Sequence, residues 1–163
     1  MLCKIVNYLR SLYRLSGYIA AIFLILVATF ILTGIASRIF GFYIRGLAEY
    51  SGYCMAASSF LALAYTFGEK GHIRITLFLE KSNKNIRRYL ELWCLSIATF
   101  FSGFLFFYFV KMLMISFNFQ ERSEGADEIL IWIPQVSVAL GSTIFFICVL
   151  HNFILLILKK NNI

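Results

Sequence analysis

Four long apolar stretches run along the chain, and charged residues bound each of them. They cover residues 15–37, 49–68, 91–117 and 132–158. A helix needs about 20 apolar residues to cross the hydrocarbon core of a bilayer. The pattern therefore predicts an all-α integral membrane protein with four transmembrane helices, folded as a single membrane domain over residues 1–163.

Short interfacial helical segments are expected beside these spans. Ile5, Leu9 and Leu12 share one helical face, and the basic residues of the same segment lie largely elsewhere. This pattern is typical of a short basic helix that lies on the inner leaflet before the chain turns into the membrane. Residues 73–81 alternate only in part, so an interfacial helix and an extended segment both remain open there.

Two helix starts can be read from the sequence. Ser82 and Asn83 are both acceptable N-caps for the third helix. Trp132 suits the level of the lipid headgroups, and Pro134 suits the first turn of a helix. The last span is therefore expected to begin at the membrane interface.

The distribution of Lys and Arg predicts the orientation. They gather in the N-terminal segment, in the loop between the second and third spans, and in the C-terminal tail. The basic residues there are Lys4, Arg10, Arg14, Lys70, Arg74, Lys81, Lys84, Arg87, Arg88, Lys159 and Lys160. The other two loops hold few basic residues, and the second of them is acidic. By the positive-inside rule, both termini are predicted to be cytoplasmic.

Composition agrees with a membrane location. The chain has 163 residues, of which 61% are hydrophobic, and a mean hydropathy of +0.82. Soluble domains are nearer 45–50% apolar. The net charge of +7 would suggest nucleic acid in a soluble protein, but here the loop asymmetry explains it. Membrane lipids, and no nucleic acid, are the expected surroundings.

No cofactor or metal site is predicted. The four cysteines, Cys3, Cys54, Cys94 and Cys148, are far apart and form no CxxC motif, so we expect free thiols. No catalytic triad, intramembrane carboxylate pair or phosphate-binding glycine loop is visible, so the chain is not expected to be an enzyme.

Two ionisable residues fall within the later spans. Lys111 lies near the outer end of the third span and either extends its amine to the interface or pairs with a carboxylate of another subunit. His151 lies near the inner end of the fourth span and is interpreted as a hydrogen-bonded helix residue.

Charged residues also mark the outer side of the membrane. Arg45 precedes Glu49 by four residues, which fits either a surface i, i+4 pair or a contact with a partner protein. The acidic outer loop fits either a solvated turn or a docking site for a periplasmic partner. The docking candidates are Glu121, Arg122, Glu124, Asp127 and Glu128.

The second span and its exit carry a resemblance to a known family. The matching residues are Glu49 and Tyr50, the run Phe-Leu-Ala-Leu-Ala-Tyr at 60–65, the run Gly-His-Ile-Arg-Ile at 71–75, and Ile133-Pro134 followed by Gly141. Together they resemble the small (Q, DctQ-like) membrane subunit of tripartite ATP-independent periplasmic (TRAP) transporters. Two positions depart from the family pattern, because Ala62 replaces a usual Gly and Thr76 a common Asp.

The resemblance implies a scaffold subunit in the bacterial cytoplasmic (inner) membrane. Its partners would be a large (M, DctM-like) elevator-type subunit and a periplasmic (P-type) substrate-binding protein. The complex would use a sodium gradient to take up an organic acid of the dicarboxylate or sialic acid type. Under this hypothesis the candidates for contact with the large subunit are Arg45, Glu49, His72, Arg74 and Lys111. A membrane anchor of a redox or quinone complex and a small stand-alone exporter are the alternatives.

Overall fold

The fold is known from a computed structural model that describes residues 2–68, 84–125 and 128–158. Within these residues the chain forms four helices, α1 (Leu2–Ile39), α2 (Leu47–Gly68), α4 (Lys84–Phe119) and α5 (Trp132–Leu158). The all-α expectation is confirmed. The predicted residues 73–81 lie outside the described part of the chain.

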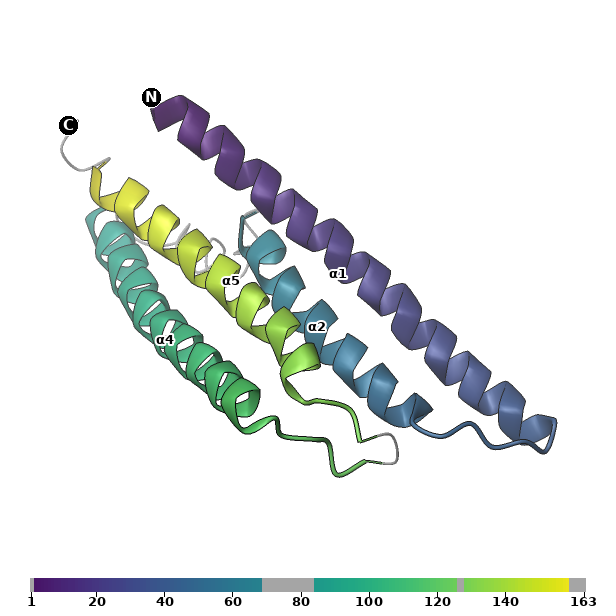
Figure 1. The fold of residues 1–163 in the computed structure, drawn as a ribbon. Coiled ribbons are helices and arrows are strands. Elements are labelled where there is room, and N and C mark those ends of the chain that lie inside the picture. Colours follow the sequence, from purple (N-terminus) through teal and green to yellow (C-terminus); the bar gives the residue numbers. More distant parts are fainter. Residues whose placement is uncertain (1, 69–83, 126–127, 159–163) are drawn as a thin grey trace.

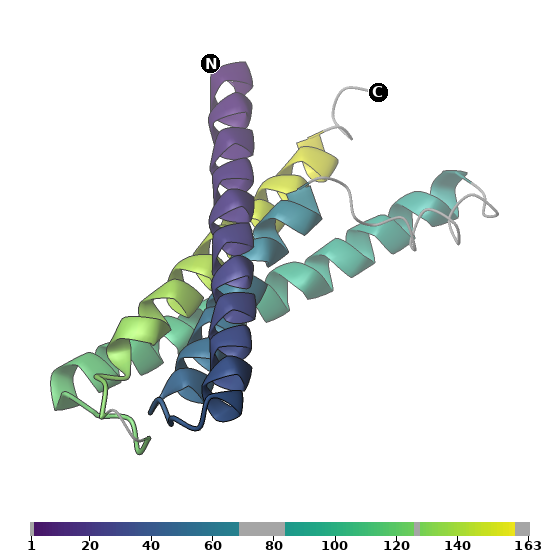
Figure 2. The same cartoon turned by 90° about the vertical axis from the view of Figure 1, so that its right-hand side faces the viewer.

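The helices form an open row rather than a closed bundle. Helix α2 packs between α1 and α5, and α5 packs between α2 and α4. The spatial order is therefore α1, α2, α5, α4, with α1 and α4 at the two edges (Figure 1; Figure 2). Along the helix axes, the first residues of α1 and the last residues of α5 lie at the same end of the molecule.

Helix α1 corrects the prediction of a separate basic helix on the inner leaflet. It continues without a break for 38 residues, or about 57 Å. Leu9 and Leu12, expected to face lipid, instead pack against the buried cluster of Tyr13, Ala64 and Cys148. The apolar face of this segment is therefore used inside the protein, and no turn separates it from the span.

Helices α1 and α2 run antiparallel along the whole of α2. At one end a Cβ on Gly68 would lie 3.2 Å from the Tyr13 ring. Further along, the rings of Phe30 and Tyr50 are 6.0 Å apart. Because Tyr13 is level with the end of α2, the first 11 residues of α1 extend about 16 Å beyond it.

Small residues bring α2 and α5 into close contact. Ala57 and Ala64 of α2 and Ala139 of α5 are buried. A Cβ added to Gly141 would lie 2.7 Å from the backbone carbonyl carbon of Phe60. Close approach of this kind through small side chains is typical of helix pairs in membranes.

Three helical segments are long and apolar enough to cross a membrane: Tyr8–Ile39, Tyr89–Phe119 and Trp132–Ile157. They confirm a membrane protein and three of the predicted spans by length and composition. Helix α2 is not among them, because its 22 residues include Glu49, three serines and three tyrosines.

Candidate functional site

The first turns of α2 meet the loop between α4 and α5 at one end of the row. Glu49 is the third residue of α2, where the helix dipole favours a negative charge. Its carboxylate lies directly over Gly125, so that a Cβ at Gly125 would overlap it. One turn further, the hydroxyls of Tyr53 and Ser123 share a hydrogen bond of 2.9 Å. Glu49 and Tyr53, at i and i+4 on one face of α2, therefore both contact the loop, and Tyr53 bonds to it.

The loop begins with a defined cap on α4. Gln120 takes a φ of 50°, and its N–H donates to the carbonyl of Phe117 at 3.4 Å. The N–H of Glu121 donates to the carbonyl of Ser116 at 3.2 Å. These two bonds form a Schellman motif, which ends the helix and turns the chain. The Ser116 hydroxyl also donates to the Glu121 carboxylate at 2.8 Å.

The chain then returns to α5 along a short antiparallel contact. Arg122 and Leu130 form an antiparallel bridge. The N–H of Ser123 donates to the Ile129 carbonyl at 2.7 Å, and that of Ile131 donates to the Glu121 carbonyl at 3.0 Å. The described residues on either side of 126–127 are therefore paired through their backbones, like the two arms of a hairpin.

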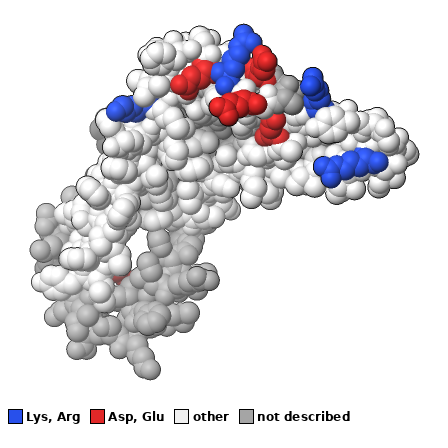
Figure 3. Space-filling view, turned by 90° about the horizontal axis from the view of Figure 1, so that it is seen from below, with Lys and Arg blue, Asp and Glu red and all other residues white. Residues whose placement is uncertain are grey.

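The charged side chains that the structure describes in this loop face outward. Glu121, Arg122, Glu124 and Glu128 are exposed, and Arg122 lies 3.6 Å from the Glu128 carboxylate. Such an exposed pair contributes little to stability. In the space-filling view, acidic side chains gather around one basic side chain, other basic side chains lie apart on either side, and most of the remaining described surface is uncharged (Figure 3).

The structure regroups the candidates for contact with the large subunit. Glu49 joins the acidic loop, which the sequence treated as a separate site. Arg45 is exposed in the turn before α2, and Gly46, at a φ of 77°, separates it from the helix. Arg45 therefore precedes α2 instead of lying on it, so the helical i, i+4 geometry considered for Arg45 and Glu49 does not apply. His72, Arg74 and Asp127 lie outside the described residues.

Lys111 lies on a different surface. It is exposed on α4, about two turns before the helix ends. Among the residues that the structure describes, no carboxylate forms an ion pair with it.

Several residues of the site were missed from sequence. Tyr53 and Ser123 form their hydrogen bond across 70 positions of the chain. The available signals were weak: Tyr53 follows Glu49 by one helical turn, and Gly125 is the one glycine in the acidic segment. At the start of α5, Trp132 Nε1 and Gln135 Oε1 are buried, and no described residue forms a hydrogen bond with either atom.

One of the described cysteines lies in the core. Cys148 is fully buried, and its thiol donates to the Ala64 carbonyl at 3.6 Å. Cys54 and Cys94 are free. In the described ranges, no three His, Cys, Asp or Glu side chains gather as metal ligands would.

Comparison with known proteins gives one match. Residues 25–159 match the family described as "Tripartite ATP-independent periplasmic transporters, DctQ component". No curated protein and no solved structure matches the chain significantly. The matched segment begins within α1 and ends just after α5, so it includes α2, α4 and α5 in full. The chain therefore belongs to the DctQ family, the small membrane component of TRAP transporters.

Proposed function

We propose that this protein is the scaffold subunit of a sodium-driven TRAP transporter, and that it supports a large DctM-like elevator subunit during uptake of an organic acid. A periplasmic substrate-binding protein delivers that acid, of the dicarboxylate or sialic acid type. Family membership supports this role over a redox anchor or a stand-alone exporter, because DctQ is a transporter component family and not an enzyme family.

The observation that carries the proposal is the open row of helices. A row leaves apolar edges on α1 and α4, where Ile25 and Phe100 are 66% and 71% exposed. Edges of this kind can face lipid or another membrane subunit, whereas a self-sufficient bundle would cover more of them. A scaffold for a second membrane protein requires such a surface.

The buried polar groups also fit a scaffold. Ser16, Ser102 and Ser142 are buried, and each hydroxyl donates to a carbonyl three residues earlier in its own helix. A transport subunit needs broken helices and polar groups directed into a midplane site. These three hydroxyls are instead satisfied within their own helices, which favours placing the substrate and sodium sites in the large subunit.

Helix α2 is proposed as a fourth crossing, with both termini in the cytoplasm. Its 22 residues span about 33 Å, slightly more than the hydrocarbon core. It lies between two helices that are themselves apolar enough to cross. Ser58 of α2 is buried and Glu49 and Tyr53 are half-buried, so lower hydropathy is tolerated there.

The folded acidic loop is proposed as a docking surface for the binding protein. Its contacts with Glu49 and Tyr53 give it a fixed position, and Glu121, Glu124 and Glu128 project outward. A preorganised acidic surface steers a basic patch of a soluble partner into contact.

Co-purification tests the function most directly. The tagged chain is expressed with the DctM-like subunit of its own genome, extracted in mild detergent and captured. We expect the large subunit to be retained in a defined ratio. Proteoliposomes holding both subunits should then take up an organic acid only with the binding protein and an inward sodium gradient. If the large subunit is never retained, the scaffold function is wrong.

A further inference from the structure

One edge of the row differs from the other in its chemistry. Along α4, exposed side chains recur every three or four residues and so form one stripe. Its members are Trp93, Ile97, Phe100, Phe104, Tyr108 and Lys111. We call this set the α4 stripe. Trp93 and Phe100 are each more than 70% exposed, so the subunit itself covers little of the stripe.

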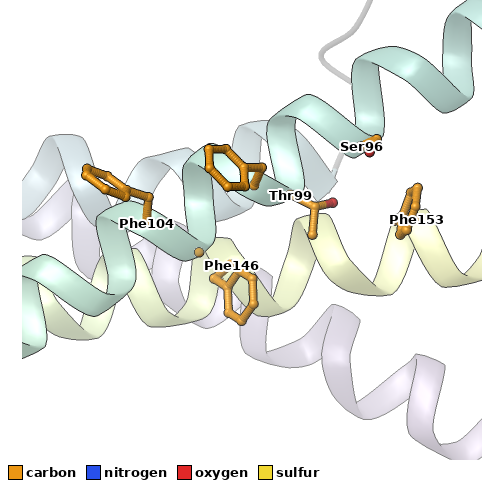
Figure 4. A pocket seen from close by; sticks show the side chains of 7 residues that line it. Ser96, Thr99, Phe104, Phe146 and Phe153 are labelled. Atoms are coloured by element: carbon orange, nitrogen blue, oxygen red, sulfur yellow. The ribbon is translucent and has the colours of Figure 1, made fainter.

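A shallow groove runs beside the α4 stripe. It lies between α4 and α5, has a volume of about 510 Å³, and includes Phe100 and Phe104 in its lining (Figure 4). Gly103 keeps it open, because a Cβ there would lie 3.2 Å from the Phe146 ring. The Thr99 hydroxyl in the lining donates to the Leu95 carbonyl at 2.7 Å. This donor is thus satisfied within α4, and the groove suits an apolar occupant.

The α1 edge is aliphatic by comparison. Apart from Tyr18, which is 70% exposed, the most exposed large side chains within the span are aliphatic and include Ile22, Ile25 and Leu32. Between Arg14 and Arg38 the helix carries no charged residue. Aliphatic surface matches lipid chains, whereas aromatic side chains are enriched in protein–protein interfaces.

Lys111 adds a charge argument. It belongs to the same stripe as Phe104 and Tyr108, on a helix apolar enough to cross the membrane. A cation at such a position is costly unless it reaches the headgroups or meets an opposite charge. No carboxylate of the described residues pairs with it, so a partner's carboxylate would complete the site.

We propose that the α4 stripe and the adjoining groove bind an apolar helix of the large DctM-like subunit, which places a carboxylate near Lys111. The α1 edge then faces lipid. This inference rests on the proposed scaffold function and adds to it which surface of the chain contacts the partner.

Site-specific photo-crosslinking tests the proposal. The photoreactive residue p-benzoylphenylalanine replaces Phe100 or Phe104 on the α4 stripe, and Ile22 or Leu32 on α1 as matched controls. All four positions are exposed, so the substitutions leave the core intact. Membranes containing the chain and the large subunit are irradiated, and tagged adducts are identified by mass. We expect adducts with the large subunit from both α4 positions and little or none from α1.

The outcomes separate the inference from the function on which it rests. Adducts from α1 and not α4, or α4 adducts only with a second copy of this chain, overturn the inference while co-purification still supports the scaffold function. If the wild-type chain retains no large subunit, the scaffold function fails, and the inference fails with it.

Substitution of Lys111 gives a second measurement. Lys111→Ala should reduce the retained large subunit by about tenfold, because the partner's carboxylate is then buried without its cation. Lys111→Arg should restore retention. Equal retention by all three proteins would show that Lys111 reaches the headgroups instead, and would remove the charge argument.

Discussion

At the scale of single residues, Glu49 has a role inside the subunit. Its carboxylate lies over Gly125, and Tyr53 bonds Ser123 one turn further along the same face of α2. A residue expected to contact a partner thus lies against the acidic loop of its own subunit. Any effect of Glu49 substitutions on assembly would therefore pass at least partly through the position of this loop.

Gly125→Ala should release the loop from α2. The new Cβ would overlap the Glu49 carboxylate, so one of the two must move. We expect faster amide hydrogen exchange over residues 121–131, with little change in helix α4. Gly52→Ala is the matched control, since no atom lies within 4 Å of a Cβ there. Unchanged exchange in Gly125→Ala would show that the loop holds its position without Glu49.

Tyr53→Phe tests the second contact with a smaller change. It removes the 2.9 Å hydrogen bond to Ser123 but keeps the ring, at a cost of about 1 kcal/mol. A modest drop in the free energy of unfolding, measured by SDS titration and circular dichroism, is expected. Ser123→Ala should cost more, because its hydroxyl also accepts from the Gly125 N–H at 3.2 Å, and the double variant should cost little more than Ser123→Ala alone. Additive losses would mean that the two hydroxyls do not act on each other.

The sequence drew attention to the start of α2 and to the acidic loop, but not to the contact between them. The charge bias and the helix start at Glu49 are local signals, and both led to the right segments. The contact between α2 and the loop depends on how α5 packs against α2, which no local pattern encodes. The positive φ of Gln120 is equally hidden, because glutamine carries no preference for that conformation.

At the scale of helices, the starts of α4 and α5 were predicted well, because capping residues or a proline mark them in the sequence. Helix α4 begins at Lys84, directly after the expected caps, and Pro134 falls in the first turn of α5. Helix α1 was divided wrongly, because an amphipathic basic segment has the same pattern whether its apolar face meets lipid or α2 and α5. Only the tertiary packing decides which of these two environments the apolar face meets.

Gly141→Ala should disturb the α2–α5 contact. The added methyl group would lie 2.7 Å from the Phe60 backbone, which cannot move as a side chain does. Overpacking of this kind costs about 1–3 kcal/mol. We expect a lower midpoint in thermal unfolding followed by tryptophan fluorescence, and no such loss in Gly34→Ala, where the nearest atom is 3.8 Å away. Equal midpoints would mean that the two helices separate at little cost.

At the scale of the molecule, two of the connections between helices lie at the same end of the helix axes. The α1–α2 turn and the acidic loop lie there, and the start of α1 lies at the other end. A row therefore presents two ends with different charge and two edges with different side chains. Each end and each edge can therefore contact a different partner, whether lipid, solvent or another protein.

Cysteine labelling can measure the orientation. In a chain with Cys3, Cys54, Cys94 and Cys148 replaced by serine or alanine, a single cysteine is placed at Glu124 or Ser11, which are both exposed. A membrane-impermeant maleimide should label the cysteine at Glu124 from the outside of intact spheroplasts and should reach that at Ser11 only after lysis. The reverse result would contradict cytoplasmic termini.

Reversing the loop charges tests docking. Changing Glu121, Glu124 and Glu128 to lysine should slow uptake at low concentrations of the binding protein, because steering by opposite charges mainly affects the association rate. High concentrations should restore uptake. Equal uptake across the whole concentration range would place docking elsewhere.

The central place of α2 has a consequence for how the protein is made. Helix α1 leaves the ribosome first, and α2, the described helix that is not apolar enough to count as a span by itself, follows as its antiparallel neighbour. Lipid alone favours the insertion of α2 weakly, but α1 offers it a matching surface from Gly68 to Tyr50. We therefore expect α1 and α2 to enter the membrane as one hairpin. A translation product that lacks α1 should leave α2 open to protease, whereas a product ending at residue 90 should protect both helices.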